Sequence, residues 1–437
     1  MLRQMTIWVM CCLYAFSLSC SKDGSTSPGS GNPPPPPPSE KIFAITGLQY
    51  SPSAVAIKPY APSFTITGTI DFNNASGGIA KLRLHTTAGW DTTIVVNGMG
   101  QSSGKITGFF ELTRPLVPVQ FGFDVWLVDA SGKESNKLGG MVSVMLDDSG
   151  ANWGSLQISL LRVLNDIGWF NNQFIAVGNG GTIGTSPDGI NWTLRPIPKN
   201  NNFRSVTWTG SMYVAVGDYG TVFLSPDGIN WADRSLTDEY SITLSGVSWS
   251  GSRVVVVGET SYPVGGTFIM SSPDGINWTR NKLSIPRSEL RSVTWTGSQF
   301  VAAGIGRTPD KAYPMILTSP DGLQWTDRSL TNVSNVLYDV IQAGQKTLAV
   351  GPGIAVSSTN GVNWTPHEIN VTGIFALAWS GRTFVGVGNG IFNSDDGIDW
   401  QQPYPGNNLM DYFRCVTWNG YMYVAAGQYE HTIMVSP

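Results

Sequence analysis

From about residue 151 to the end of the chain, short apolar runs alternate with turns in a pattern that repeats about every 40 residues. Each unit contains an apolar strand that mostly ends in Trp, a second apolar strand ending in Gly, a third strand ending in a Ser-Pro-Asp-Gly-Ile-Asn-Trp box, and a polar strand. The first strand recurs around Ile167, Val206, Val247, Val293, Val340, Leu377 and Val416. The second strand ends at Gly178, Gly217, Gly258, Gly304, Gly351, Gly388 and Gly427. Both series predict seven four-stranded units.

The box itself is complete only six times, at Ser186–Trp192, Ser225–Trp231, Ser272–Trp278, Ser319–Trp325, Ser358–Trp364 and Ser394–Trp400. A seventh box begins at Ser436-Pro437, where the sequence stops. Upstream, Ser149–Trp153 resembles the missing half of a box, so residues near 151–160 are expected to supply the outer strand of the last unit. Joining both ends of the repeat in one unit removes exposed sheet edges. We therefore predict a seven-bladed β-propeller over residues 148–437.

The box has a structural explanation. Its Ser and Asp side chains are expected to accept hydrogen bonds from backbone N–H groups one or two residues on, and its Gly to adopt a turn conformation. Its Trp is expected to begin the next strand and to pack between blades. One box has Asn in place of the acid, an exchange that a turn tolerates better than a metal or catalytic site. The predicted turn residues are Asp188, Asp227, Asp274, Asp321, Asn360 and Asp396.

These boxes resemble the Asp-box (BNR) repeat of sialidases, related glycosidases and photosystem assembly-factor-like propellers. The resemblance covers about two thirds of the chain and implies a turn between the third and fourth strands of each blade. Sialidases resemble one another in six blades, an early Arg-Ile-Pro motif, three arginines for the substrate carboxylate and a Tyr–Glu nucleophile pair. Here seven units are counted, Ile285-Pro286-Arg287 has the letters in another order, and no Tyr–Glu pair can be assigned. Sialidase activity is not expected.

Residues 41–147 have a different pattern, in which short runs alternate strictly between apolar and polar residues, as in Val119–Val125. Strands of this kind separated by regular turns predict a β-sandwich. The stretch Phe123–Leu138 resembles the final hairpin of immunoglobulin-like or fibronectin type III-like modules in bacterial surface proteins. The expected fold class is therefore all-β, with an immunoglobulin-like sandwich, in a spacer role, before the propeller.

Residues 1–20 have one positive charge, Arg3, and an apolar stretch, Ile7–Phe16, that is too short to span a bilayer. This is typical of a signal peptide. Its end, Ser17–Cys20, resembles a bacterial lipobox, although Ser17 stands where Leu is usual. The resemblance implies lipidation of Cys20, and a cleaved signal without lipid is the alternative.

The residues after Cys20 add to the lipoprotein reading. Ser21-Lys22-Asp23 resembles the charged tag of surface-exposed lipoproteins in some Gram-negative bacteria. Residues 21–40 are rich in Gly, Ser and Pro and include Pro33–Pro38, a composition typical of a tether. We expect an outer-membrane lipoprotein, exposed on the cell surface, that contacts the membrane through its lipid anchor only.

The candidate site lies on the face opposite the boxes, where the long loops are also expected. The position that opens the innermost strand is occupied by Asn165, Arg204, Ser245, Arg291, Tyr338, Phe375 and Arg414. Arginine and aromatic side chains around one channel mouth suit an anionic or sugar ligand. The candidate ligand-binding residues are Arg204, Arg291, Tyr338, Phe375 and Arg414. The alternative is that each arginine pairs locally or stacks on a neighbouring Trp.

Composition narrows the function further. The net charge of −4 and the absence of a basic block argue against nucleic-acid binding. No His/Cys/Asp cluster has the spacing of metal ligands, and no catalytic set can be assigned, so no metal, cofactor or catalytic residue is expected. Cys415 occupies the position that Ser205 and Ser292 hold in sister units, which predicts a small buried residue.

Three functions remain open. The leading hypothesis is a non-catalytic, surface-anchored lipoprotein that presents the propeller as a binding platform for a glycan or a protein. The rival is a glycoside hydrolase or lyase with two carboxylates in a pocket on the face opposite the boxes. The third is an assembly or scaffolding factor, which would present a flat apolar patch in place of a pocket.

Overall fold

The computed structural model divides the chain into two compact units, Met1–Asp147 and Asp148–Pro437. It describes residues 42–56, 63–87, 91–113, 119–145, 153–157, 162–197, 199–236, 242–261, 265–281, 283, 285–404, 412–427 and 432–436. The predicted signal peptide with Cys20, and the predicted tether, lie outside the described residues.

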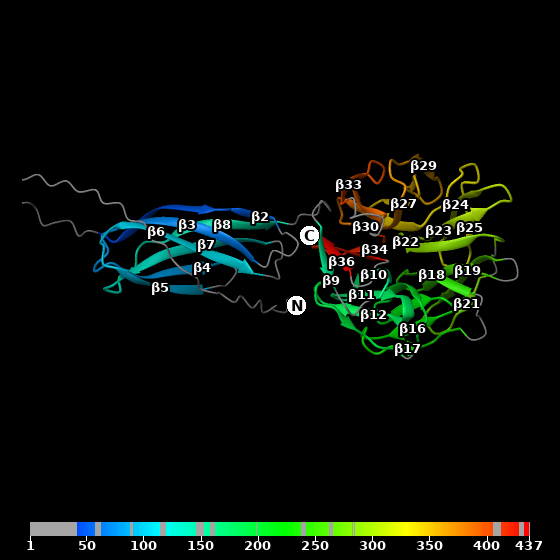
Figure 1. Ribbon diagram of the computed structural model, residues 1–437, viewed down its shortest axis with the longest axis horizontal. Coiled ribbons are helices and arrows are strands. Elements are labelled where there is room, and N and C mark those ends of the chain that lie inside the picture. The colour runs from blue at the N-terminus through cyan, green and yellow to red at the C-terminus, as the bar shows by residue number, and fades with distance from the viewer. Residues whose placement is uncertain are drawn as a thin grey trace, which may run out of the picture. The chain divides into compact units, whose positions relative to one another are not determined.

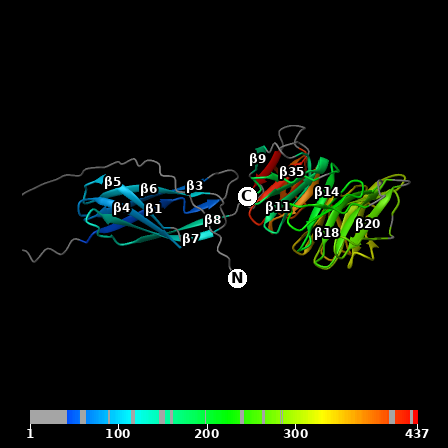
Figure 2. The ribbon, with the colours of Figure 1, turned by 90° about the horizontal axis from the view of Figure 1, so that it is seen from below.

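The first unit consists of two sheets whose strands run along one common direction (Figure 2). The smaller sheet contains β1 (Ala44–Ser51), β3 (Ser63–Asn73) and β6 (Gly104–Thr113), in that order. The larger sheet contains β2 (Ala54–Ala56), β8 (Leu138–Met145), β7 (Val119–Asp129), β4 (Ile79–Thr86) and β5 (Asp91–Met99). Pairing is antiparallel except between β2 and β8.

The alternating pattern of β7 explains how the two sheets pack. Phe121, Phe123, Val125 and Leu127 are buried, whereas the residues between them face outward to a greater degree. Val125 and Leu127 share one apolar cluster with residues of the smaller sheet, such as Phe72. The apolar faces of the sheets therefore form a single core, which makes this unit a β-sandwich.

Within the described residues, the second unit is built from seven antiparallel sheets of four strands each, and no α-helix is present (Figure 1). The first sheet contains β10 (Leu164–Phe170), β11 (Gln173–Gly178), β12 (Ile183–Ser186) and β13 (Thr193–Leu194), and the second contains β14 (Phe203–Trp208), β15 (Tyr213–Gly217), β16 (Val222–Ser225) and β17 (Ala232–Asp233). The third sheet contains β18 (Ile242–Trp249), β19 (Val254–Thr260), β20 (Gly266–Ser272) and β21 (Thr279–Arg280). The fourth contains β22 (Glu289–Trp295), β23 (Phe300–Arg307), β24 (Ala312–Ser319) and β25 (Thr326–Asp327). The fifth sheet contains β26 (Asp339–Ala343), β27 (Lys346–Gly351), β28 (Ile354–Ser358) and β29 (Thr365–Glu368). The sixth contains β30 (Ile374–Trp379), β31 (Phe384–Gly388), β32 (Gly390–Ser394) and β33 (Gln401–Tyr404). The seventh contains β34 (Phe413–Trp418), β35 (Tyr423–Gly427), β36 (Thr432–Ser436) and β9 (Gly154–Gln157). One short 3-10 helix, η1 (Asn179–Gly181), follows β11.

The seven sheets surround a central channel, as in a β-propeller. In Figure 1 the first strands, such as β10, β22 and β34, lie toward the centre, and the fourth strands, such as β17 and β29, lie at the outside. Residues of all seven first strands line one cavity of about 460 Å³. The seventh sheet combines both ends of this unit, because β36 pairs antiparallel with β9, with Val435 opposite Gly154.

The second strand of each sheet is a nearly continuous apolar run because neighbouring sheets cover both of its faces. Every residue of β15 is buried. Tyr213 and Ala215 of this strand belong to one cluster with Ile175 and Val177 of the preceding sheet. Packing between sheets, and not within one sheet, therefore forms the core of this unit.

The boxes form the turns between third and fourth strands. In the first box, the Ser186 hydroxyl accepts hydrogen bonds from the backbone N–H groups of Asp188 and Gly189. Oδ1 of Asp188 accepts from the N–H groups of Ile190 and Asn191 at 2.9 and 2.7 Å. The donors are two and three residues on, so the expectation of one or two residues is confirmed only for the shorter bonds, and the turn is wider by one residue.

The remaining features of the box follow from this turn. Gly189 has a φ of 73°, in the left-handed region that favours glycine. The indole N–H of Trp192 donates back to the Gly189 carbonyl at 2.9 Å, and β13 begins one residue after this Trp and not at it. Asn360 uses its Oδ1 as the aspartates do, accepting from two backbone N–H groups at 2.9 Å. The acid is therefore needed for its acceptor geometry and not for its charge.

Six of the seven first strands contain a β-bulge directly after they begin, and β26 is the exception. In β14, Phe203 pairs with Gly217 and Ser205 with Val216, so Arg204 is the extra residue between them. A Cβ atom on Gly217 would lie 1.9 Å from the carbonyl oxygen of Asn202. The same conflict, at 1.5 to 2.1 Å, arises at every repeated glycine of the second strands, namely Gly178, Gly217, Gly258, Gly304, Gly351, Gly388 and Gly427. The prediction that the second strand ends at this glycine was wrong for β19 and β23, which continue to Thr260 and Arg307 because they pair with longer third strands. The repeated glycine is present because the bulged strand passes directly over it.

Gly217→Ala is expected to destabilise the second unit by about 3 kcal/mol, because a backbone carbonyl cannot move away from the added methyl group without loss of the bulge. Gly210→Ala is the matched control: it has a φ of 88° and open space around the added Cβ, so only the local strain of about 1 kcal/mol is expected. Urea unfolding followed by tryptophan fluorescence measures both. Equal losses in the two variants would contradict the proposed role of the close approach.

Candidate functional site

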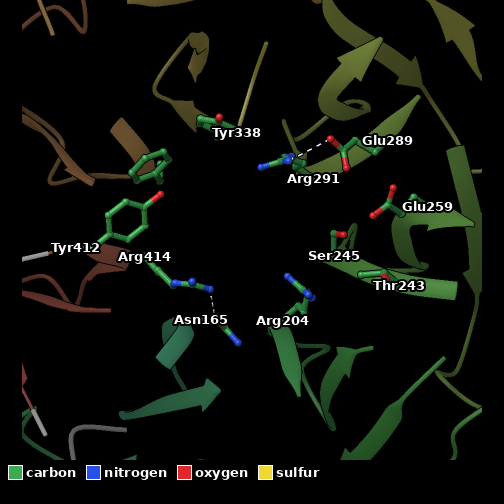
Figure 3. Close-up of a pocket in the computed structure, with 11 residues that line it drawn as sticks. Asn165, Arg204, Thr243, Ser245, Glu259, Glu289, Arg291, Tyr338, Tyr412 and Arg414 are labelled. Atoms are coloured by element: carbon green, nitrogen blue, oxygen red, sulfur yellow. Dashed lines mark hydrogen bonds and ion pairs between the residues drawn. The ribbon is translucent and has the colours of Figure 1, made fainter. Parts of the chain in front are cut away.

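Six bulged residues and Tyr338 line one mouth of the channel. The extra residue is Asn165, Arg204, Ser245, Arg291, Phe375 or Arg414 in six of the sheets. In the fifth sheet, Tyr338 directly precedes β26 and takes the same place, with its N–H bonded to the Val350 carbonyl at 2.7 Å. All seven residues line a cavity of about 340 Å³, together with Thr243, Glu259, Glu289 and Tyr412 (Figure 3). The five candidate residues predicted from the sequence, Arg204, Arg291, Tyr338, Phe375 and Arg414, are thus brought together in one pocket.

The mouth and the boxes lie on opposite faces because the first and third strands of each antiparallel sheet run in the same direction. First strands begin at the mouth, and third strands end at the boxes. The box residues Asp188, Asp227, Asp274, Asp321, Asn360 and Asp396 are therefore separated from the pocket by the length of a strand.

One wall of the pocket is aromatic. The ring centroids of Tyr338 and Phe375 are 5.1 Å apart, and those of Phe375 and Tyr412 are 4.7 Å apart in a stacked arrangement. The guanidinium of Arg291 lies over the Tyr338 ring at 4.7 Å, which is a cation–π contact. Tyr338, Phe375 and Tyr412 thus form an aromatic arc that crosses three neighbouring sheets, beside the polar remainder of the mouth.

Two of the three arginines have carboxylate partners. Nε of Arg204 is 2.5 Å from Oδ1 of Asp218, whose other oxygen accepts a hydrogen bond from Asn202. Nη2 of Arg291 is 3.0 Å from Oε1 of Glu289. Local pairing, one of the alternatives considered from the sequence, therefore describes these two side chains, although Arg291 stacks on a tyrosine and not on a tryptophan.

The third arginine is different. Nη1 of Arg414 donates to Oδ1 of Asn165 at 3.0 Å, and Nε is buried without a hydrogen-bond partner. Among the described residues, no carboxylate forms an ion pair with Arg414 within 4.0 Å. Its guanidinium therefore has a hydrogen bond to a neutral amide but, among the described residues, no ion-pair partner.

Two glutamates from neighbouring sheets lie on the side of the mouth away from Tyr412 (Figure 3). Burial raises the pKa of Glu259, and the nearby Glu289 carboxylate raises it further. Burial acts in the same direction on Glu289, but Arg291 and Arg307 outweigh it and lower the pKa of Glu289. The pair therefore holds its first proton on Glu259, while Glu289 stays ionised between two arginines.

Sequence reasoning missed four of these lining residues, and the repeat contains a signal for each. Thr243, Glu289 and Tyr412 each lie two residues before the bulge, so they point to the same side of the strand and form a second layer of the mouth. Glu259 directly follows the repeated glycine of a second strand, as Asp218 does in the preceding sheet.

Below the mouth, a layer of side chains joins neighbouring sheets around the channel. Oδ2 of Asp166 accepts hydrogen bonds from the Ser205 hydroxyl and the Val206 N–H of the next sheet, both at 2.9 Å. Its Oδ1 accepts from the N–H of Ile167 at 2.8 Å. One carboxylate thus fixes two adjacent first strands in register.

Asp339 does the same on the other side of the channel. Its Oδ1 accepts from the Ser292 hydroxyl of the preceding sheet at 2.6 Å and from the N–H of Val340 at 2.8 Å. Its Oδ2 accepts from the Leu377 N–H of the following sheet at 2.8 Å. This residue therefore ties three sheets together.

Cys415 occupies the same layer and is 2% exposed, which confirms the prediction of a small buried residue. Its thiol donates weakly to the Ala426 carbonyl at 3.5 Å, and burial raises its pKa well above the usual range. It is therefore a neutral packing residue and not a reactive thiol.

The described residues contain neither a metal-binding cluster nor a membrane-spanning helix. No group of three or more His, Cys, Asp or Glu side chains there has the arrangement of a metal site. In the same part of the chain, no helix has the length and apolar character needed to cross a membrane.

Comparison with known proteins gives similarity of fold at low sequence identity. No family model matches the chain, and no curated protein matches it. The chain is similar to the WD40 β-propeller domain of Doa1, with a TM-score of 0.49 and 10% identity over 65% of this chain and 95% of that one. It is also similar to the computationally designed Ika8 protein, with a TM-score of 0.45 and 12% identity over 65% of this chain and 99% of that one.

Asp166→Asn is expected to change the pH dependence of stability. Burial raises the pKa of Asp166 to about 6, despite the hydrogen bonds that favour its charged form. Because this value exceeds that of about 3.9 in the unfolded chain, the stability contributed by protonation is present below pH 4 and lost as the pH rises through 6. The free energy of unfolding of the wild type, minus that of the variant, should therefore fall between pH 4 and pH 7.

Taking this difference at each pH removes the effects of all other titrating groups and the constant cost of the altered hydrogen bonds. Urea unfolding at a series of pH values gives it directly. A difference that is independent of pH over this range would show that Asp166 ionises as an exposed carboxylate does.

Proposed function

We propose that this chain is a non-catalytic binding module that takes a glycan in the mouth of its propeller channel. The aromatic arc of Tyr338, Phe375 and Tyr412 carries this proposal. Sugar rings have one apolar face, which stacks on aromatic side chains, and hydroxyl groups at their edges, which need polar partners. The mouth offers the arc on one side and Asn165, Arg204 and the glutamates on the other. Its volume of about 340 Å³ is that of a small-ligand pocket.

We also infer that the seven sheets are the blades of one seven-bladed propeller of the Asp-box class. The six complete box turns and the joint seventh sheet support this assignment. The preceding sandwich is proposed to be immunoglobulin-like, in keeping with its final hairpin of β7 and β8.

The alternatives fit the mouth less well. A glycosidase needs two carboxylates at least about 5 Å apart, with the sugar between them. Glu259 and Glu289 are instead within hydrogen-bond reach of each other, and Glu289 is bound to two arginines. A protein ligand or a scaffolding role would favour a broad flat surface over a concave mouth of this size.

We further propose that the module is presented on the outer surface of a Gram-negative cell by a lipid on Cys20. The support is the sequence alone: the apolar segment that ends in Ser17–Cys20, the charged residues after it, and the tether with six consecutive prolines. A tether of this kind would hold the folded units away from the membrane.

Phe375→Ala is expected to weaken glycan binding at least about tenfold, because it removes the central ring of the arc. A glycan array identifies the ligand, and calorimetry on the best hit measures the affinities. Tyr421→Ala is the matched control, because Tyr421 is 45% exposed in the turn after β34, at the end of the strand away from the mouth. Absence of any glycan ligand, or equal binding by the Phe375 variant, would exclude this function, and binding of a protein alone would favour the alternative platform.

Cys20→Ala is expected to abolish incorporation of labelled palmitate when the chain is expressed in a Gram-negative host, and to release the protein from the membrane fraction. Cys415→Ser is the control: it restores the residue of the sister sheets and should keep the label. An unlabelled wild type would support the alternative of a cleaved signal without lipid.

A further inference from the structure

The charges around the mouth are unequally compensated. Asp218 neutralises Arg204, and Glu289 neutralises Arg291 and also binds Arg307 at 2.9 Å. Arg414 is the arginine of the bulge positions whose only hydrogen-bond partner, among the described residues, is an amide. A guanidinium in this state attracts an anion more strongly than one already bound to a carboxylate.

Arg414 is also held in place for such a ligand. Asn165 donates from its Nδ2 to Oδ1 of Asn179 at 2.8 Å and to the carbonyl of Phe203 at 2.7 Å. Both amide hydrogens are thus engaged, which fixes the amide oxygen toward Arg414. Nε of Arg414 is buried, and its Nη1 donates to Asn165, so among the described residues Nη2 is left without a partner and can donate to a ligand.

The anion site adjoins the aromatic arc. Tyr412 lies two residues before Arg414, and the two side chains lie next to each other on the same side of the mouth (Figure 3). Phe375, from the preceding sheet, stacks on Tyr412. A ring that packs against the exposed part of Tyr412 therefore has one edge beside the guanidinium, where an acidic substituent of that ring would meet it.

The layer below limits how deeply an anion enters. Asp166 and Asp339 are one residue deeper than the bulge positions, and no cation is paired with either of them among the described residues. Their carboxylates repel a second negative charge that approaches along the channel. An acidic group is thus attracted at the level of Arg414 and repelled below it.

From these features we propose that the ligand is an acidic sugar, bearing a carboxylate or a sulfate, and that Arg414 binds its acidic group. This inference rests on the proposed glycan-binding function and adds the chemical class of the ligand. Carboxylate and sulfate both accept paired hydrogen bonds from a guanidinium, so the geometry selects the anion and not its source.

Matched sugars test the proposal with the full chain: glucuronic acid against glucose, galacturonic acid against galactose, and galactose 6-sulfate against galactose, each followed by calorimetry and ligand-observed NMR. At least one acid is expected to bind about tenfold or more tightly than its neutral partner. The uronates and the sulfate ester are separate arms that distinguish the two sources of charge. Raising the salt concentration should reduce the preference.

Arg414→Gln should remove the preference while leaving neutral-sugar binding unchanged, and Arg414→Lys should retain part of it. Arg234→Gln is the control for net charge, because Arg234 is exposed after β17, outside the pocket, and bonds only a backbone carbonyl among the described residues. Phe375→Ala should weaken acid and neutral sugars alike. Thermal melting of each variant verifies folding.

The outcomes distinguish failure of the anionic ligand class from failure of glycan binding. If acidic and neutral sugars bind the wild type equally, or the Gln variant keeps the preference, the anionic class is wrong and glycan binding stands. If no sugar of either kind binds, both the glycan function and this inference are overturned.

Discussion

The close approach between a bulged first strand and the glycine opposite it determines the geometry of the whole second unit. At each sheet a carbonyl oxygen occupies the volume where any other residue would carry its Cβ. A bulge turns one side chain toward the channel in six sheets, Tyr338 takes the same place in the fifth sheet, and these seven residues form a ring around one mouth. The pocket is therefore a property of backbone packing first and of side-chain chemistry second.

The layer beneath the ring explains how sheets with few backbone bonds between them keep a common height. Asp166 and Asp339 accept hydrogen bonds from the N–H groups of neighbouring first strands. Burial of these carboxylates disfavours their charged form, so the register is maintained at some electrostatic cost. Apolar packing between the second strands supplies the main cohesion, and the polar layer sets the alignment.

The features that the sequence predicts best are those determined by residues a few positions apart and those that recur in every repeat. The box turn involves residues within three positions of one another, and the bulge residue occurs at one place in every repeat, so both were predictable from their spacing. The pairing of Arg204 with Asp218 was not, because Asp218 follows the neighbouring strand and reaches Arg204 only through the register of the bulged strand. The sandwich and propeller architectures follow from alternation and repetition, whereas the pairing of Tyr338 with Arg291 depends on the curvature that brings two sheets together.

A bulged residue has no partner in the ladder of backbone hydrogen bonds, so its identity does not affect the pairing of the strands around it. The side chain at a bulged position can therefore change without altering the strand pairing, although ring members that contact each other, such as Asn165 and Arg414, are constrained together. Antibodies obtain comparable freedom from loops on a rigid frame, whereas here the variable positions are on the frame itself. Such a ring is a combinatorial recognition surface whose members are already ordered before any ligand arrives, and new specificities are reachable by single substitutions.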